Sequence, residues 1–317
     1  FNFLYIFHML ENKQKTLNKT VDFLGTGLHS GKTVSMKLHP AEANTGIVFR
    51  RTDLKKNNEI KANYENVSSA KLCTKIENDQ GVSISTIEHL MASFYICGVD
   101  NSVVELNGEE VPIMDGSAIE FVKKIKEIGL KTLEENRKFI KIKKRVELKL
   151  DDKSISIEPS SESLKVAFTL SYENNPLIRS QTNCVDFKDK NLENIYSART
   201  FCLYEDIEKV KSLGLAKGGN LDNAVVIKGD KILNKKGLRS KNEFVNHKIL
   251  DLAGDFMLTG KRVIGSVSCM HGGHLLTNDF LRKLLSDQSN FTVVESIQNI
   301  SNLKKIAPNQ KRIAVNA

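Results

Sequence analysis

The chain has 317 residues, of which 40% are hydrophobic and 27% are charged, and its formal net charge is +9. This composition is typical of a soluble globular protein, and no apolar run approaches the ~18 residues of a membrane-spanning helix. The five cysteines are odd in number and form no C-x-x-C pair, which argues against a disulfide framework. Such cysteine usage favours a reducing compartment, so we expect a cytoplasmic protein.

The positive charge has two explanations. It would attract an anionic partner such as a nucleotide, a phosphate group, nucleic acid or a membrane surface. It also follows from a composition rich in Lys, Asn and Ile, as in proteins from AT-rich genomes, and the lysines are spread along the chain. We do not favour a nucleic-acid-binding protein, because the sequence has no C-x-x-C finger, no basic helix face and no interleaved aromatic and basic residues.

The first half of the chain predicts strands followed by helices. Three segments have strand patterns: residues 34–38, 46–49 and 103–106. Residues 85–95 predict a helix that begins at Ser or Thr and ends near Gly98. Residues 118–128 predict a second helix, which ends at Gly129.

The second half repeats this order. Strand patterns lie at residues 139–150, 155–157, 164–170 and 263–269, and helical patterns at 206–213, 243–258 and 281–286. Strands followed by helices, twice over, predict an α+β fold of two similar domains, each a helix layer packed on one face of a β-sheet. We expect a first domain at 15–132, a charged linker at 133–138 and a second domain at 139–305, with an N-terminal extension at 1–14 and a C-terminal tail at 306–317.

The helical segment 243–255 has the most informative pattern. His247, Asp251 and Asp255 recur every four residues, so they lie on one stripe of the helix beside an apolar face. An imidazole and a carboxylate at i and i+4 on a helix that buries its other face make half of a metal site.

Residues 85–90 supply the other half of the predicted site. His89 would complete a set of two histidines and one aspartate, which binds zinc and leaves a fourth position for water. Glu88 would lie beside this site as a base. It is poorly placed to be a ligand itself, because adjacent side chains diverge. A Glu-His pair alone is more often a surface pair. Together with His247 and Asp251 it predicts a metal-dependent hydrolase, in which Fe²⁺ is an alternative to Zn²⁺.

Seven motifs, in order from about Lys15 to Asp279, resemble the zinc-dependent UDP-3-O-acyl-N-acetylglucosamine deacetylases of lipid A biosynthesis. They are residues 25–31 (GTGLHSG), 46–53 (GIVFRRTD), 85–90 (STIEHL), 111–117 (VPIMDGS), 197–201 (SARTF), 243–255 and 272–274 (GGH). The resemblance implies two domains with facing helix layers and one catalytic zinc ion between them. It also implies a monomer that hydrolyses the acetamide of a UDP-linked, 3-O-acylated amino sugar, releasing acetate and the free 2-amine in the committed step of the pathway.

The resemblance also implies catalytic roles. Glu88 is expected to be the general base, and a cationic His274 the general acid or oxyanion stabiliser, with its charge held by Asp255. The hydroxyl of Thr200 is expected to stabilise the oxyanion. Without the resemblance, a histidine after two glycines is an ordinary loop residue, and a threonine in a strand is structural. A catalytically idle homologue is the remaining alternative, although every ligand and acid-base position of the family is filled here.

The remaining assignments concern the substrate. By the same resemblance, Lys248 is expected to bind a phosphate or carbonyl of the substrate, although a solvated helix lysine is the plain alternative. Phe201 would pack on the sugar or acyl group, unless it is a core aromatic. Residues 213–222 would form an apolar passage for the acyl chain. The substrate-side set is completed by Leu28, by Leu215 and Leu221 in the passage, where the family often has Phe at the latter position, and by Cys73 near the metal.

Overall fold

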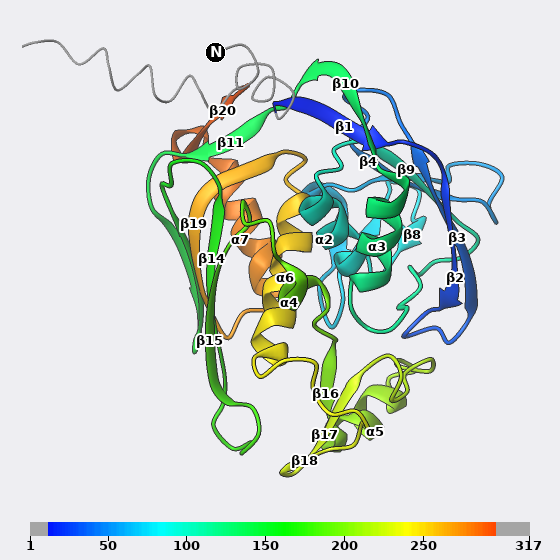
Figure 1. Ribbon diagram of the computed structural model, residues 1–317, viewed down its shortest axis with the longest axis vertical. Helices are drawn as coiled ribbons and strands as arrows, with labels where there is room; N and C mark the ends of the chain where they lie inside the picture. Colours follow the sequence, from blue (N-terminus) through cyan, green and yellow to red (C-terminus); the bar gives the residue numbers. More distant parts are fainter. Residues whose placement is uncertain (1–11, 296–317) are drawn as a thin grey trace, which may run out of the picture.

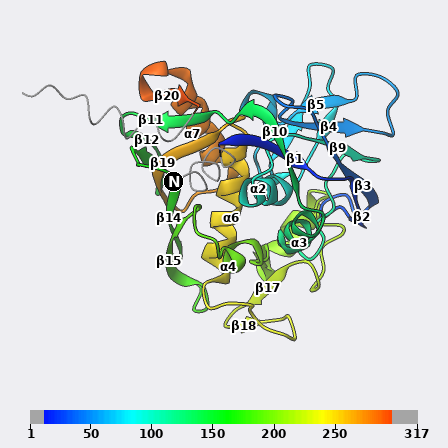
Figure 2. The same cartoon turned by 45° about the horizontal axis from the view of Figure 1, so that its top comes forward.

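The computed structural model describes residues 12–295, in which two sheets form the outer layers and four helices lie between them (Figure 1). The inner helices are α2 (Glu88–Cys97), α3 (Ile119–Ile128), α6 (Glu243–Met257) and α7 (His274–Ser286). Helices α2 and α6 pack against each other and join the two halves of the chain (Figure 2). The predicted α+β fold is confirmed.

The first half of the chain builds a five-stranded sheet. Its order is β2 (Val21–Thr26), β3 (Thr33–Pro40), β9 (Ser102–Leu106), β4 (Ile47–Arg51) and β5 (Glu59–Lys61), with β4 and β9 parallel. Along β3 the buried positions alternate with exposed ones, so Val34, Met36 and Leu38 face the helices. A smaller sheet of β6 (Val67–Ser69), β7 (Lys75–Glu77) and β8 (Ser83–Ile84) follows the short helix η1 (Tyr64–Asn66).

The second half builds a seven-stranded sheet around a long central strand, β19 (Arg262–Met270). Its other strands are β11 (Phe139–Ile142), β12 (Val146–Leu150), β13 (Lys153–Glu158), β14 (Leu164–Tyr172), β15 (Arg179–Asp186) and β20 (Phe291–Val294), the last after η2 (Gln288–Asn290). Between β15 and α6 the chain forms α4 (Glu193–Tyr196) and a small sheet of β16 (Phe201–Leu203), β17 (Val225–Lys228) and β18 (Lys231–Ile232) with α5 (Tyr204–Ser212).

The segment expected to be a linker is mostly a strand. Strand β10 (Leu130–Asn136) covers part of residues 133–138 and pairs antiparallel with β1 (Lys13–Leu17). This ribbon crosses the top of the molecule between the two sheets (Figure 1). Because five of the seven residues of β10 are exposed, the sequence has no apolar alternation that would mark a strand. The domain limits themselves stay a prediction, and the tail expected at 306–317 lies outside the described residues.

The predicted helices exist, with shifted ends. Helix α2 begins three residues later than expected, because Ser85 N donates to Glu109 O (3.0 Å) and Thr86 has a φ of 58°. It ends where Gly98 takes a left-handed conformation, with a φ of 85°. Helix α7 begins at His274, seven residues before the predicted helix at 281–286, so this histidine starts a helix rather than lying in a loop.

Candidate active site

The predicted site residues gather in a pocket of 600 Å³ between the two halves of the chain. Glu88 and His89 come from the first turn of α2, His247 and Asp251 from α6, and His274 from the start of α7. All five are buried, with exposed fractions of 3–8%. Titratable side chains at this depth are stable only when they bind one another, the backbone or a ligand.

His89, His247 and Asp251 form the candidate metal centre. One ligand atom from each lies within 4.8 Å of the other two. Asp251 Oδ1 is 3.5 Å from His89 Nε2 and 3.4 Å from His247 Nε2, and it is buried without a hydrogen-bond partner among residues 12–295. A buried carboxylate oxygen that faces two imidazole nitrogens fits a bound cation, because the cation would replace the missing hydrogen bond.

Neighbouring groups hold the histidine and aspartate side chains in the protonation states that bind a metal. His247 Nδ1 lies 3.0 Å from Ala198 O, so this nitrogen carries the proton and Nε2 keeps its lone pair for a metal. Burial lowers the pKa of His247 to about 4, which leaves the imidazole neutral at neutral pH. The other oxygen of Asp251 accepts a hydrogen bond from Lys248 Nζ at 2.7 Å. Burial alone would lower the pKa of Lys248, but Asp251 outweighs burial and raises it, so Lys248 is charged.

Glu88 and His274 face each other at the edge of this centre, with 3.8 Å between Glu88 Oε1 and His274 Nε2. Burial raises the pKa of Glu88. His274 Nδ1 lies 2.8 Å from Asp255 Oδ2, and although burial opposes the charge, Asp255 and then Glu88 raise the pKa of His274 to about 9. The pair therefore combines a carboxylate of increased basicity with a cationic imidazole, as general acid-base chemistry requires.

Thr74 is a member of this network that the sequence did not reveal. Its hydroxyl donates to Asp255 Oδ1 at 2.7 Å, and its backbone N–H donates to Glu88 Oε2 at 3.1 Å. The same hydroxyl lies 3.2 Å from His274 Nδ1, so Thr74 contacts both members of the acid-base pair from the segment before β7. Thr74 follows Cys73 directly, and its only signal in the sequence is that position beside a residue already assigned to the site.

Comparison with known proteins decides the family. A sequence model of the UDP-3-O-acyl N-acetylglycosamine deacetylases matches residues 14–286. The chain belongs to this family. Among curated relatives, the UDP-3-O-acyl-N-acetylglucosamine deacetylase of Campylobacter fetus is 44% identical over 283 residues, covering 89% of this chain and 95% of its own. The enzyme of that name from Aliivibrio fischeri is 42% identical over 291 residues, covering 90% and 95%. The expected family, and with it a hydrolytic deacetylase, is confirmed.

Two further pockets of this deacetylase adjoin the candidate metal centre. One, of 420 Å³, shares Leu28, Thr200 and Phe201 with the metal pocket and continues between α5 and β17. Leu221 lines it, with 45% of its side chain exposed. Its other apolar walls are Leu72, Ile207, Val210, Ala224, Val226 and Leu233. The backbone of Thr200 is fixed from both sides, since its N–H donates to Gly116 O and its carbonyl accepts from Val225 N, each at 2.8 Å.

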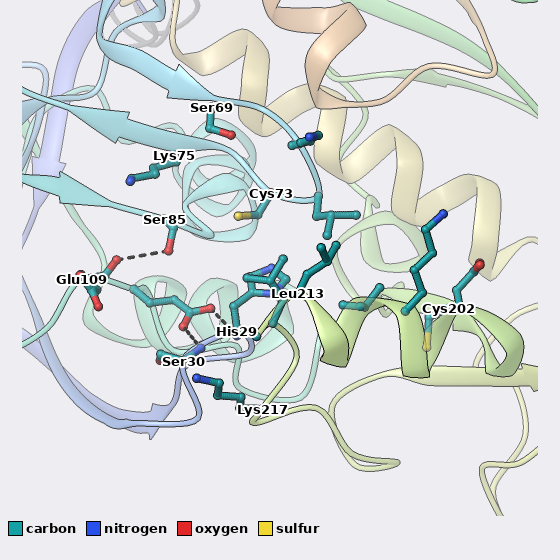
Figure 3. Close-up of a pocket in the computed structure, with 18 of the residues that line it drawn as sticks. His29, Ser30, Ser69, Cys73, Lys75, Ser85, Glu109, Cys202, Leu213 and Lys217 are labelled. Carbon is teal, nitrogen blue, oxygen red and sulfur yellow. Dashed lines mark hydrogen bonds between the residues drawn. The ribbon is translucent and has the colours of Figure 1, made fainter.

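The other pocket is a wider groove of 880 Å³, and Leu215 and Cys73 lie there rather than in the narrow pocket. Figure 3 shows Cys73 in this groove. Burial, and then the charge of Glu88, raise the pKa of the Cys73 thiol to about 12. Cys73 is not part of the candidate metal cluster. Phe201 lines all three pockets and packs edge-on against Phe244, with 4.9 Å between ring centres.

Within residues 12–295, the molecule has no helix of the length and apolar character that a membrane crossing requires.

Proposed function

We propose that this chain removes the acetyl group of UDP-3-O-(3-hydroxyacyl)-N-acetylglucosamine in the cytoplasm, with one zinc ion held by His89, His247 and Asp251. The unpartnered, buried Oδ1 of Asp251, facing two imidazoles beside an acid-base pair, is the observation that carries this proposal. Zinc suits a set of two imidazoles and one carboxylate, although Fe²⁺ is accepted by the same set. The cytoplasmic location is supported by five cysteines that are all free.

The side chains of the site have different roles in the proposed reaction. When bound, zinc polarises the acetamide carbonyl and makes water a stronger acid. Glu88 takes the proton of the attacking water, and its increased basicity suits this step. The Thr200 hydroxyl and the cationic His274 stabilise the oxyanion, and His274 is the group able to protonate the departing amine. Asp255 holds His274 in its charged form.

The phosphate groups and the acyl chain of the substrate would contact other residues around the site. Lys248, charged and beside the metal centre, is placed for a substrate phosphate or carbonyl. The narrow pocket that opens beside Thr200 has the apolar walls that an acyl chain needs, with Leu28 and Leu221 among them. Leu215 and Cys73 belong to the wider groove, so their contact with substrate would lie outside that narrow pocket.

The test is acetate release from UDP-3-O-(3-hydroxyacyl)-N-acetylglucosamine, measured before chelation, after chelation and after zinc is added back. We expect release to vanish with the metal and to return with up to one equivalent of zinc. A zinc-loaded, folded protein that releases no acetate from any member of an acyl-length series would contradict the proposed function. Release that survives complete metal removal would contradict the role of the metal.

A further inference from the structure

A pocket of 360 Å³ lies at the opposite ends of the helices that carry the candidate metal ligands. Asp100 lines it just after the end of α2, and Met257 lines it at the end of α6. His89 is the second residue of α2, a helix of ten residues, so roughly 13 Å of helix separates the two sites. The walls come from both halves of the chain.

The lining of this pocket is strongly cationic. Five basic side chains and one carboxylate surround it: Lys61, Arg137, Lys138, Lys261 and Arg262, with Asp100. The single carboxylate is already engaged, because Asp100 Oδ2 accepts hydrogen bonds from Lys15 N at 2.8 Å and from Arg137 Nη2 at 2.6 Å. Among the residues that the structure describes, no second acidic residue lines the pocket to neutralise the remaining basic side chains.

Arg262 is the most buried basic side chain of this set that has an unsatisfied N–H, and its guanidinium also lies over the Tyr95 ring, 4.6 Å from the ring centre. Its side chain is 15% exposed, and its Nε is buried 3.7 Å from Asp100 Oδ1, with no hydrogen-bond partner among the described residues. Burial, and then the charge of Arg137, lower the pKa of the Arg262 guanidinium, and Asp100 opposes them only in part. Arg262 shares its one nearby carboxylate, Asp100, with Arg137, so the positive charge of the pair is only partly balanced and an anion entering the pocket would be stabilised there.

Helix capping explains part of this arrangement but not all of it. Arg137 Nη2 donates to Gly98 O at 3.0 Å, and Arg262 Nη2 donates to Tyr95 O at 2.8 Å, so both arginines satisfy carbonyls at the end of α2. Those bonds use one nitrogen of each guanidinium. Capping also gives no reason for Lys61 and Lys261, which form no ion pair within residues 12–295 but line the same pocket.

We propose that this pocket binds a small phosphate-bearing anion, with Arg262, Lys61 and Lys261 as its principal ligands. The planar guanidinium binds phosphate oxygens in pairs, and lysines add charge without fixed geometry. The volume lies within the range of small-molecule sites. A bound anion would bridge the two halves of the chain at the end of α2 remote from the candidate metal ligands, separately from any phosphate of the proposed substrate.

Isothermal titration of the full chain with inorganic phosphate, against sodium chloride of equal ionic strength, tests this site. The variant Lys61→Ala/Lys261→Ala should weaken phosphate binding by about tenfold or more, because it removes two charge-assisted contacts. Lys61 is exposed and Lys261 is half-buried, and neither forms an ion pair among residues 12–295, so the variant should fold. The control Lys55→Ala/Lys56→Ala removes the same charge from the exposed turn between β4 and β5, and it should change the affinity by less than about twofold.

A sugar phosphate in place of inorganic phosphate separates two sources of the ligand. Tighter binding of glucose 1-phosphate would assign the pocket to a phosphate ester, and equal or weaker binding would assign it to the free ion. Absence of binding beyond the chloride control would overturn the proposal, as would equal losses in the two double variants. Loss of binding in Lys248→Ala, with binding retained in Lys61→Ala/Lys261→Ala, would overturn it by moving the anion to the substrate pocket.

Discussion

At the scale of single residues, the site depends on where each charge is held. Asp251 gives one oxygen to Lys248 and leaves the other, buried, facing His89 and His247. Glu88 and His274 both have raised pKa values, for opposite reasons: burial disfavours the charged carboxylate, whereas neighbouring carboxylates favour the charged imidazole. The candidate metal ligands and the acid-base pair are different side chains that adjoin one another, with His274 Nε2 3.9 Å from Asp251 Oδ2, so each group can be changed by its own substitution.

The change His247→Ala should remove stoichiometric metal. It takes away a neutral imidazole whose Nε2 faces Asp251 Oδ1 at 3.4 Å, and two ligands hold zinc much less tightly than three. Metal content after dialysis against a chelator, measured by mass spectrometry, gives the result. One equivalent of zinc retained after that challenge would show that His247 is not a ligand.

The change Glu88→Ala should keep the metal and lose catalysis. Loss of a general base lowers kcat by about 10²–10⁴-fold, and Glu88 is not among the residues of the metal cluster. Steady-state acetate release and metal analysis on the same preparation are the two measurements. Turnover within a few fold of the parent protein would remove Glu88 from the mechanism.

The change Thr74→Val should lower kcat and leave metal content unchanged. It removes the hydroxyl that donates to Asp255 Oδ1, and a lost hydrogen bond to a charged group is worth about 1.5–3 kcal/mol, or roughly ten- to a hundredfold. Thr74→Ser keeps the hydroxyl and should restore most of kcat. If the valine and serine variants were equally active, the hydroxyl would have no positioning role.

The candidate metal cluster could be proposed from the sequence at this scale, and the position of Thr74 could not. His247 and Asp251 lie four residues apart on one helix, so local spacing was enough to pair them. Thr74 lies 181 residues from Asp255 in the chain, and only the folded structure brings them together. The backbone carbonyl of Ala198, which orients His247, has no side-chain signal in any sequence pattern.

At the scale of elements, helices α2 and α6 approach each other closely because of one glycine. A Cβ added at Gly254 would lie 2.1 Å from Glu88 O, in the first turn of α2. The sequence predicted both helices from their periodicity, but it could not indicate how near they lie. Strands also differ in how far the sequence predicts them. Strand β3 was predicted because apolar and polar residues alternate along it, whereas every residue of β15 is exposed or half-exposed and no such pattern exists.

The change Gly254→Ala should destabilise the protein, although alanine favours a helix over glycine by about 1 kcal/mol. The added methyl group meets backbone atoms, which cannot rotate away, so α2 must shift and carry Glu88 with it. We expect a loss of about 2 kcal/mol or more in urea unfolding, together with reduced kcat. Gly108→Ala, where the nearest atom would be 3.8 Å away, is the matched control and should be within about 0.5 kcal/mol of the parent protein. If Gly254→Ala left the free energy of unfolding unchanged, close contact between α2 and α6 at this position would be excluded.

At the scale of the whole molecule, the two halves are joined by polar contacts on both sides of the α2–α6 interface. On one side, Arg239 of the second half donates to Asp115 Oδ2 of the first half at 2.7 Å. At the other end, Arg262 and Arg137 reach the end of α2. No pattern in the sequence indicated these contacts, because the partners lie up to 167 residues apart in different elements.

The change Asp115→Asn should reduce stability at neutral pH and matter less in acid. Burial opposes ionisation, but hydrogen bonds from Arg239 and then Ser117 outweigh it and lower the pKa of Asp115. A lowered pKa means that the stabilisation is fully present above the unfolded value of about 3.9 and is lost as pH falls through the folded value. We expect a difference of about 1 kcal/mol from the parent protein at pH 7 that narrows below about pH 4, measured by urea unfolding. A difference that stays constant down to pH 3 would exclude the charge of Asp115 as its cause.

The placement of the three candidate ligands has a consequence for the lifetime of the protein. His89 belongs to α2 and the other two to α6, so a bound zinc ion would tie together segments that are more than 150 residues apart. Metal that binds only the folded chain lowers the population of unfolded molecules in proportion to its free concentration. Zinc scarcity in a cell would then reduce the amount of this enzyme through proteolysis of unfolded chains, in addition to reducing the activity of the molecules that remain.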